Sequence, residues 1–253
     1  MALLPSAKKS KETQDPKNLI IFSQPKVGKT SALSQLDGNL IVDLEYGTKY
    51  VEGYVVQTNN YVDLFNLANE LITQPHNFKH VSIDTVTALE DIAAEYAADK
   101  YKVSAIGKNW ESDGVKKTGR DLLQLPNGQG YGLLRDAMQE IIGWFERTGL
   151  DIILVCHVKD KLITDKTGEL SVRAIDLTGK IGNILSAKSD AIGFMYRDVD
   201  KNQVYIDFGA SGNTVISCAR PPHLNCKKLL LSEMDENGNL ICHWDDIYTS
   251  LKQ

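Results

Sequence analysis

The sequence predicts an α/β fold, a mainly parallel β-sheet flanked by helices, with a β-hairpin near the C-terminal end. Apolar runs rich in β-branched residues alternate with stretches of helical periodicity, the pattern of parallel strands joined by helices. The runs are apolar throughout, as expected for strands buried on both faces. A length of 253 residues and a hydrophobic content of 42% suit one large domain that buries a core without disulfides or metal.

Each element has a local signal. Strands are expected at residues 18–23, 39–45, 80–86, 151–158, 190–197 and 203–209. Helices are expected at residues 29–36, 60–74, 87–101 and 131–148. Asp37-Gly38, Pro75 and Gly149 mark three of the helix ends, because glycine and proline stop helices. Residues 228–231 and 240–244 flank the turn sequence Asp-Glu-Asn-Gly-Asn and predict the hairpin.

Charge and cysteine content restrict the classes of function. The net charge of -5 argues against a nucleic-acid binder that acts through overall charge, but local basic loops remain open. The cysteines are Cys156, Cys218, Cys226 and Cys242. They have no extracellular spacing, and with His223 and His243 they form no compact zinc pattern, so a structural role in a reducing compartment is expected. The sequence has no secretory signal and no apolar run of about 18 residues, so a cytoplasmic location is expected.

A phosphate-binding loop is predicted between the first strand and the first helix, where residues 23–30 read Ser-Gln-Pro-Lys-Val-Gly-Lys-Thr. In such a loop the backbone N–H groups cradle phosphates, Lys29 reaches the β- and γ-phosphates, and Thr30 offers its hydroxyl to Mg²⁺. Ser23 replaces the usual first glycine, which fits if its φ is negative. A chance Gly-Lys-Thr turn is the alternative, but the flanking strand and helix favour the phosphate loop. The residues expected to bind nucleotide are Gln24, Pro25, Lys26, Val27, Gly28, Lys29, Thr30 and Ser31.

Polar side chains end three further strands at the same expected edge of the sheet. Asp84 is expected beside Mg²⁺, although an aspartate there can instead cap the following helix. Glu45 is expected to orient the attacking water; Asp43 is the lesser choice, and a solvated loop acid is the alternative. His157 is expected to hydrogen-bond the γ-phosphate and report its loss to the following loop, although a lone histidine at a strand end is more often structural.

This order of features resembles that of RecA-like recombinases and related hexameric helicases. Residues 20–30, 42–47, 81–85 and 155–161 look most like the phage branch, which contains nucleotide-binding proteins that act as RecA-like single-strand annealing factors. The resemblance implies a RecA-like P-loop NTPase core in which Glu45, Lys29 and His157 are catalytic, Thr30 and Asp84 hold Mg²⁺, and ATP is the nucleotide. His157 stands where recombinases usually have glutamine. The expected division is a flexible arm at residues 1–17, the ATPase core at 18–215, and a C-terminal hairpin extension at 216–253 packed on the core.

Two connecting segments, residues 100–130 and 159–180, fall where RecA-like proteins place DNA-binding loops. Basic side chains there would contact phosphates, and aromatic side chains would stack on unpaired bases. The expected DNA contacts are Lys102, Lys108, Trp110, Lys116, Lys117, Arg120, Lys159 and Lys161, and the second segment also holds Lys166, Arg173 and Lys180. The alternative is a pair of solvated loops with Trp110 packed in the core. Lys180 and Arg197 are possible trans-acting residues.

The expected function is ATP-dependent binding and annealing of single-stranded DNA in phage recombination, with Mg²⁺-dependent ATP hydrolysis by a homo-oligomer in the host cytoplasm. A phage or host single-strand binding protein is a further expected partner, and no membrane partner is expected. Two alternatives stay open. One is a helicase-loader or packaging-type motor ATPase, and the other is a nucleotide-gated protein-interaction module.

Overall fold

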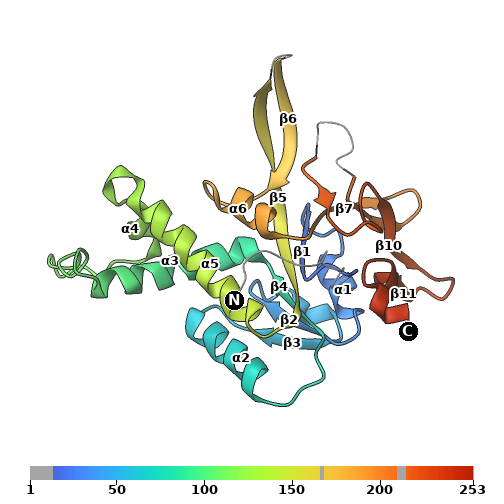
Figure 1. Cartoon of the computed structure of the whole chain (residues 1–253), viewed down its shortest axis with the longest axis horizontal. Helices are drawn as coiled ribbons and strands as arrows, with labels where there is room; N and C mark the ends of the chain where they lie inside the picture. Colours follow the sequence, from blue (N-terminus) through green and yellow to red (C-terminus); the bar gives the residue numbers. More distant parts are fainter. Residues whose placement is uncertain (1–13, 166–167, 210–214, 253) are drawn as a thin grey trace, which may run out of the picture.

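A twisted β-sheet organises the computed structural model, which describes residues 14–165, 168–209 and 215–252 (Figure 1). The helices are α1 (Lys29–Ser34), α2 (Tyr61–Thr73), α3 (Val86–Val103), α4 (Gly119–Leu123), α5 (Gln129–Glu146) and α6 (Ile181–Lys188). The strands are β1 (Asn18–Ser23), β2 (Asn39–Asp43), β3 (Tyr54–Gln57), β4 (His80–Asp84), β5 (Asp151–Asp165), β6 (Gly168–Ile175), β7 (Ala191–Asp198), β8 (Gln203–Asp207), β9 (Cys218–Ala219), β10 (Lys228–Met234) and β11 (Leu240–Cys242). Short 3-10 turns include η1 (Thr48–Tyr50), η2 (Pro126–Gly128), η4 (Trp244–Asp246) and η5 (Thr249–Lys252).

The strand order brings distant parts of the chain together. Along the sheet the order is β11-β10-β8-β7-β1-β5-β4-β2-β3. The strands from β7 to β3 in this order run parallel, whereas β8, β10 and β11 continue the sheet in antiparallel pairing. Because the carboxyl ends of parallel strands share one edge, the segments that follow β1, β2 and β4 meet there, beside His157 of β5, whose register partner is Ser23 at the end of β1.

Side chains of the central strands alternate between two buried cores. Ile20 and Phe22 of β1 belong to the first core, which takes in the apolar faces of α2, α3, α5 and α6. Leu19 and Ile21 belong to the second core, which takes in α1 and the C-terminal segment. The Trp244 indole N–H donates to the Ala32 carbonyl at 2.7 Å and so fastens the C-terminal segment to α1.

The predicted fold class is confirmed: the sheet is mainly parallel, helices flank it, and β10 and β11 form the C-terminal hairpin. The expected helices and strands are present, with ends that differ by a few residues, except that β5 extends well beyond the expected strand. Five of the described helices and strands were not expected, namely β3, α4, β6, α6 and β9. Their runs are short or interrupted by polar residues, so periodicity is weak there.

The segment at 159–180 was expected to be a loop, and this was wrong. Most of it forms the antiparallel ribbon β5–β6, which projects from the sheet in Figure 1. Register pairs such as Lys159 with Ala174 and Lys161 with Val172 show that basic residues occupy strand positions. The charged residues concealed the strand pattern, because a projecting ribbon leaves side chains in solvent and tolerates polar residues on its faces.

The two ends of the described chain lie close to each other. Asp15 accepts hydrogen bonds from the Thr249 hydroxyl and N–H and from the Ser250 N–H. The Lys17 amino group pairs with Asp151 at the start of β5. Residues 1–13 of the expected flexible arm lie outside the described residues.

Candidate functional site

The loop after β1 has the backbone geometry that close approach to phosphates requires. Gly28 has φ of 112°, in the left-handed region that favours glycine, and α1 begins at the next residue. Ser23 is fully buried at the end of β1 and is not among the described residues with positive φ, so serine fits this position as expected. The exposed residues Gln24, Pro25 and Lys26 form the turn between β1 and Gly28.

Lys29 is anchored before any phosphate arrives. Its side chain is 8% exposed, and its amino group donates to Ser23 Oγ at 3.0 Å and to the Gln24 carbonyl at 3.2 Å. Burial lowers the pKa of Lys29, while the carboxylates of Asp84 and Glu45 oppose this effect. Two of the three ammonium hydrogens are thus used, and the third can reach a phosphate oxygen. The hydrogen bond from Lys29 to Ser23 was not predicted. The sequence signal for it was a hydroxyl residue at a position that is usually glycine.

Thr30 and Asp84 form a second anchored pair. The Thr30 hydroxyl donates to Asp84 Oδ2 at 2.6 Å, and Asp84 is 5% exposed. Burial raises the pKa of Asp84, and the Thr30 hydrogen bond and the Lys29 charge oppose this. The helix-cap alternative for Asp84 is not what the structure shows, because Thr85 caps α3 by accepting the Ala88 N–H at 3.2 Å.

A hydroxyl beside a buried carboxylate is a donor set that suits Mg²⁺, which takes one or two protein oxygens and completes its octahedron with phosphates and water. The unfavourable burial of the Asp84 charge is a second sign of fit, since a cation there would offset it. Among the residues that the structure describes, no group of three or more His, Cys, Asp or Glu side chains could hold a metal ion. Thr30 and Asp84 would therefore hold Mg²⁺ together with a bound nucleotide.

Glu45 and His157 lie in contact. Glu45 Oε1 accepts a hydrogen bond from the Thr85 hydroxyl at 2.7 Å and lies 3.0 Å from His157 Nε2. The Glu45 side chain is 42% exposed and that of His157 is 24% exposed. His157 Nδ1 is buried without a hydrogen-bond partner in the described part of the chain. The contact to a carboxylate therefore favours the tautomer that carries its proton on Nε2.

Asp43, the other acid at the end of this strand, has a structural role. It is 1% exposed, and its two carboxylate oxygens accept hydrogen bonds from the N–H groups of Glu45, Gly47 and Thr48, from the Thr48 hydroxyl and from the Gln57 amide. Burial alone would raise the pKa of Asp43, but the hydrogen bonds outweigh burial and lower it. All of its acceptor capacity is directed into the protein, so Asp43 holds the Glu45 segment in place.

A cavity of about 600 Å³ opens beside the phosphate loop. Its lining includes Gly28, Ser31, Tyr50, Glu52, Arg197, Asn202, Glu233 and Asn239. Such a mixed polar cavity next to the phosphate anchors has room for the sugar and base of a nucleotide. Arg197, which we considered as a trans-acting residue, donates to the Val27 carbonyl of its own phosphate loop at 3.3 Å and to Asn202 Oδ1 at 3.2 Å.

Two of the expected DNA contacts at 102–120 are engaged in ion pairs with nearby acids. Lys102 pairs with Asp99 at 3.3 Å and with Glu111 at 3.2 Å, and Lys117 pairs with Asp113 at 2.8 Å. Trp110 is half-buried and packs edge-to-face on Tyr101, with ring centroids 5.3 Å apart. This geometry favours the packing alternative for Trp110. Lys108, Lys116 and Arg120 are exposed.

The expected contacts on the ribbon differ from one another. Lys159 donates to the Leu177 carbonyl and pairs with Asp176 at 3.2 Å, whereas Lys161 is exposed. Arg173 lies over the Phe194 ring at 5.3 Å. Lys166 falls outside the described residues.

The phosphate loop, the Thr30–Asp84 pair and the parallel sheet define a P-loop nucleotide-binding protein. The AAA domain family model matches residues 15–225, most of the chain, so the chain belongs to this family. No curated protein matches it. Among solved structures the chain is similar to the crystal structure of the RadB recombinase, with 11% identity and a TM-score of 0.47 over 88% of this chain and 90% of that chain. Within the described residues, no helix is both long enough and apolar enough to cross a membrane.

Proposed function

We propose that the protein is a RecA-like, Mg²⁺-dependent ATPase in which Glu45 orients the water that attacks the γ-phosphate. The observation that carries the proposal is the fixed position of the Glu45 carboxylate. Thr85 and His157 hold it at the sheet edge where Lys29 and Thr30 lie, yet it remains 42% exposed. A carboxylate that is held in place and still open to solvent can accept a proton from water.

Lys29, Thr30 and Asp84 together provide for neutralisation of the negative charge of the phosphates. Lys29 neutralises charge that develops on the transferred phosphoryl group, with its third ammonium hydrogen free for that purpose. Thr30 and Asp84 hold Mg²⁺, which when bound neutralises the negative charge of the phosphate oxygens. The cavity beside Ser31 receives the nucleoside. His157 responds to the presence or loss of the γ-phosphate through its contact with Glu45.

The sensor is joined to the base of the ribbon by hydrogen bonds. The His157 N–H donates to the Thr87 hydroxyl at 3.1 Å, which donates in turn to the Asp176 carbonyl at 3.3 Å. The Asp176 N–H donates back to the His157 carbonyl at 2.9 Å. A shift of His157 on loss of the γ-phosphate would therefore be transmitted to Asp176 and the turn that follows it.

We propose further that hydrolysis serves the binding and annealing of single-stranded DNA by a homo-oligomer, in the manner of the phage annealing proteins that the four site segments resemble. A single-strand binding protein of the phage or host is the expected partner in that reaction. Membership of the AAA domain family and the link from His157 to the ribbon both support a nucleotide-dependent change outside the ATP site.

Two measurements test the proposal. Phosphate release from ATP should require Mg²⁺, and single-strand affinity should differ between ATP, a slowly hydrolysed analogue and no nucleotide. A wild-type protein that releases no phosphate under any condition contradicts the ATPase assignment. Hydrolysis without salt-dependent affinity for single strands contradicts the DNA assignment alone, and leaves a motor on another substrate or a nucleotide-gated protein partner.

A further inference from the structure

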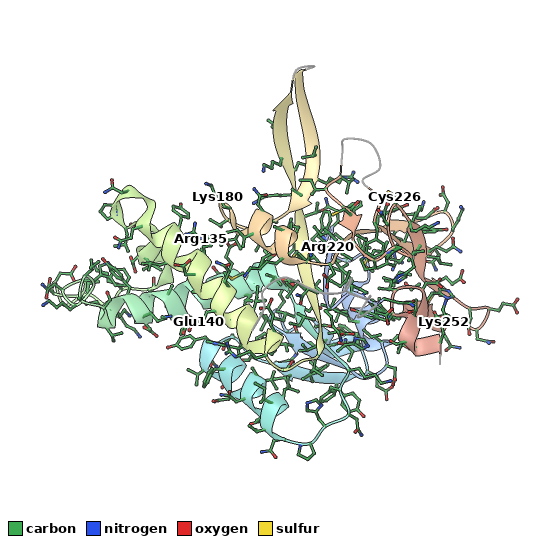
Figure 2. All side chains as sticks on the ribbon, in the orientation of Figure 1. Arg135, Glu140, Lys180, Arg220, Cys226 and Lys252 are labelled. Carbon is green, nitrogen blue, oxygen red and sulfur yellow. The ribbon has the colours of Figure 1, made fainter. Side chains whose placement is uncertain are left out.

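One cation, Arg197 near the end of β7, lines the cavity beside the phosphate loop; no other described residue of the lining has a positive charge. β7 runs parallel to β1, and the last register pair joins Phe22 to Phe194. β1 then turns into the phosphate loop, whereas β7 continues to Asp198 and carries Arg197 past the loop. The cavity lies between α1 and the C-terminal hairpin β10–β11, close to the Lys252 label in Figure 2.

Neutral oxygens hold the Arg197 guanidinium against the loop. Nη2 donates to the Val27 carbonyl at 3.3 Å, and Nη1 donates to Asn202 Oδ1 at 3.2 Å. Asn202 lies in the turn between β7 and β8 with φ of 52°, a conformation that asparagine adopts more readily than most residues. These bonds use two of the five guanidinium N–H groups. The guanidinium is thus held in place and still has donors for an anion.

The acids of the cavity do not neutralise this charge. Glu233 accepts a hydrogen bond from the Gln203 amide at 2.8 Å and lies 3.4 Å from His243 Nε2, and Glu52 is exposed. Arg197 takes part in none of the ion pairs found within the described part of the chain. A guanidinium forms shorter and stronger hydrogen bonds with a phosphate than with a carbonyl or amide oxygen. A phosphate group is therefore the ligand that this position favours.

The lining of the cavity indicates which phosphate is nearest. Lys29 and Thr30, which are expected to serve the β- and γ-phosphates and Mg²⁺, do not line it, whereas Gly28 and Ser31 do. A nucleotide with its nucleoside in the cavity must therefore pass Gly28 and Ser31 with the phosphate that carries the nucleoside, the α-phosphate. Gly28 leaves this approach open, because Arg197 Nη2 is 3.5 Å from the place where a Cβ would lie.

We propose that Arg197 binds the α-phosphate of the nucleotide held by the phosphate loop of its own subunit. The inference rests on the nucleotide binding proposed above and replaces the trans-acting role considered for this residue. The α-phosphate keeps its charge in ATP, in the transition state and in ADP, so a contact there stabilises all three alike. Arg197 therefore lowers KM and leaves kcat unchanged. A trans-acting arginine would instead stabilise the charge of the transition state and raise kcat.

Nucleotide affinity and steady-state hydrolysis of Arg197→Gln test the assignment. Loss of a charge-assisted hydrogen bond should weaken binding of a slowly hydrolysed ATP analogue, of ADP and of AMP by the same factor, about 10- to 150-fold. KM for ATP should rise by a similar factor at unchanged kcat, and Arg197→Lys, which keeps the charge, should recover part of the affinity. Lys201→Gln is the matched control. It removes one positive charge from the same β7–β8 turn, outside the cavity lining, and should bind all three nucleotides as the wild type does.

A mixture of two variants separates action within a subunit from action between subunits. Lys29→Ala keeps Arg197 but lacks a working phosphate loop, and Arg197→Gln has the reverse defect. If Arg197 serves its own subunit, mixing the two proteins leaves KM raised. A mixture that regains the wild-type KM overturns the assignment, and so does a fall in kcat at unchanged KM.

The nucleotide series gives the remaining outcomes. A loss of affinity for the ATP analogue but not for ADP, or for ADP but not for AMP, overturns the α-phosphate assignment, as does unchanged affinity for all three. Arg197 is exposed, so the melting temperature of Arg197→Gln should equal that of the wild type. A wild-type protein that binds nucleotide without hydrolysing it contradicts the proposed ATPase alone, because the affinities still test Arg197. A wild-type protein that binds no nucleotide contradicts both.

Discussion

Replacing Glu45 with glutamine separates the chemistry of this residue from its place in the hydrogen-bond network. One oxygen, Oε1, receives both the Thr85 hydroxyl and the His157 Nε2 contact. A glutamine amide oxygen can accept the same two contacts, so Glu45→Gln should retain the fold and bind nucleotide nearly as the wild type does. The amide cannot take a proton from water. Hydrolysis should therefore slow by about 10²-fold or more, the contribution of a lost general base.

Asp43→Asn is the matched control, because it removes the same charge two residues away. Asp43 Oδ2 alone receives the Thr48 N–H, the Thr48 hydroxyl and the Gln57 amide, and Oδ1 receives the N–H groups of Glu45 and Gly47. An asparagine keeps one acceptor oxygen and turns an NH₂ group toward donors, so two or three buried hydrogen bonds are lost. At about 1–3 kcal/mol for each unsatisfied group, we expect a loss of roughly 2–5 kcal/mol. For a chain of this size that is a decrease of about 5–20 °C in melting temperature.

Single-turnover phosphate release and thermal unfolding, measured on the same preparations, distinguish the two carboxylates. Glu45→Gln should hydrolyse ATP more slowly at an unchanged melting temperature, whereas Asp43→Asn should have a lower melting temperature. The reasoning is refuted if Glu45→Gln hydrolyses ATP at the wild-type rate while Asp43→Asn, assayed well below its melting temperature, binds ATP and does not hydrolyse it.

Three further variants test other parts of the molecule. Lys29→Ala should abolish phosphate release and weaken nucleotide binding at an unchanged melting temperature, and normal turnover would exclude the phosphate loop. Trp110→Ala should cost about 1–3 kcal/mol in urea unfolding through its contact with Tyr101, and a loss of DNA affinity without loss of stability would restore Trp110 as a stacking residue. Burial lowers the pKa of His80 to about 4. Between pH 6.5 and 4, His80 therefore stays neutral in the folded state but binds a proton in the unfolded state. Stability should then fall by roughly 3 kcal/mol as pH falls from 6.5 to 4, and His80→Phe should remove that part of the pH dependence.

The parts of the site that were predictable from the sequence are those whose chemistry depends on local order. Gly28, Lys29 and Thr30 follow a strand and open a helix, and phosphate binding requires that order. Asp84 was expected near them because parallel strands end at one edge, and the Thr30–Asp84 hydrogen bond agrees with that placement. The catalytic roles of Glu45 and His157 stay predictions, although the structure brings the two side chains into contact.

The role of Asp43 could not be read from the sequence. Its partners Thr48 and Gln57 come from η1 and β3, and neither element has a strong periodic signal. The role of Asp43 thus depends on tertiary contacts that a single sequence does not specify.

The lysine cluster at 102–120 shows why a count of basic residues is a weak guide to a nucleic-acid surface. Lys102 and Lys117 are neutralised by Glu111 and Asp113 of the same segment, so much of the local charge excess exerts little field beyond it. Lys180, by contrast, lies outside any such pair among the described residues and faces a hollow that Tyr131 also lines. A cation can form a phosphate contact only when binding does not break an existing ion pair of similar strength. Among the described residues Lys180 meets that condition, and in the cluster at 102–120 Lys108, Lys116 and Arg120 meet it, whereas Lys102 and Lys117 do not.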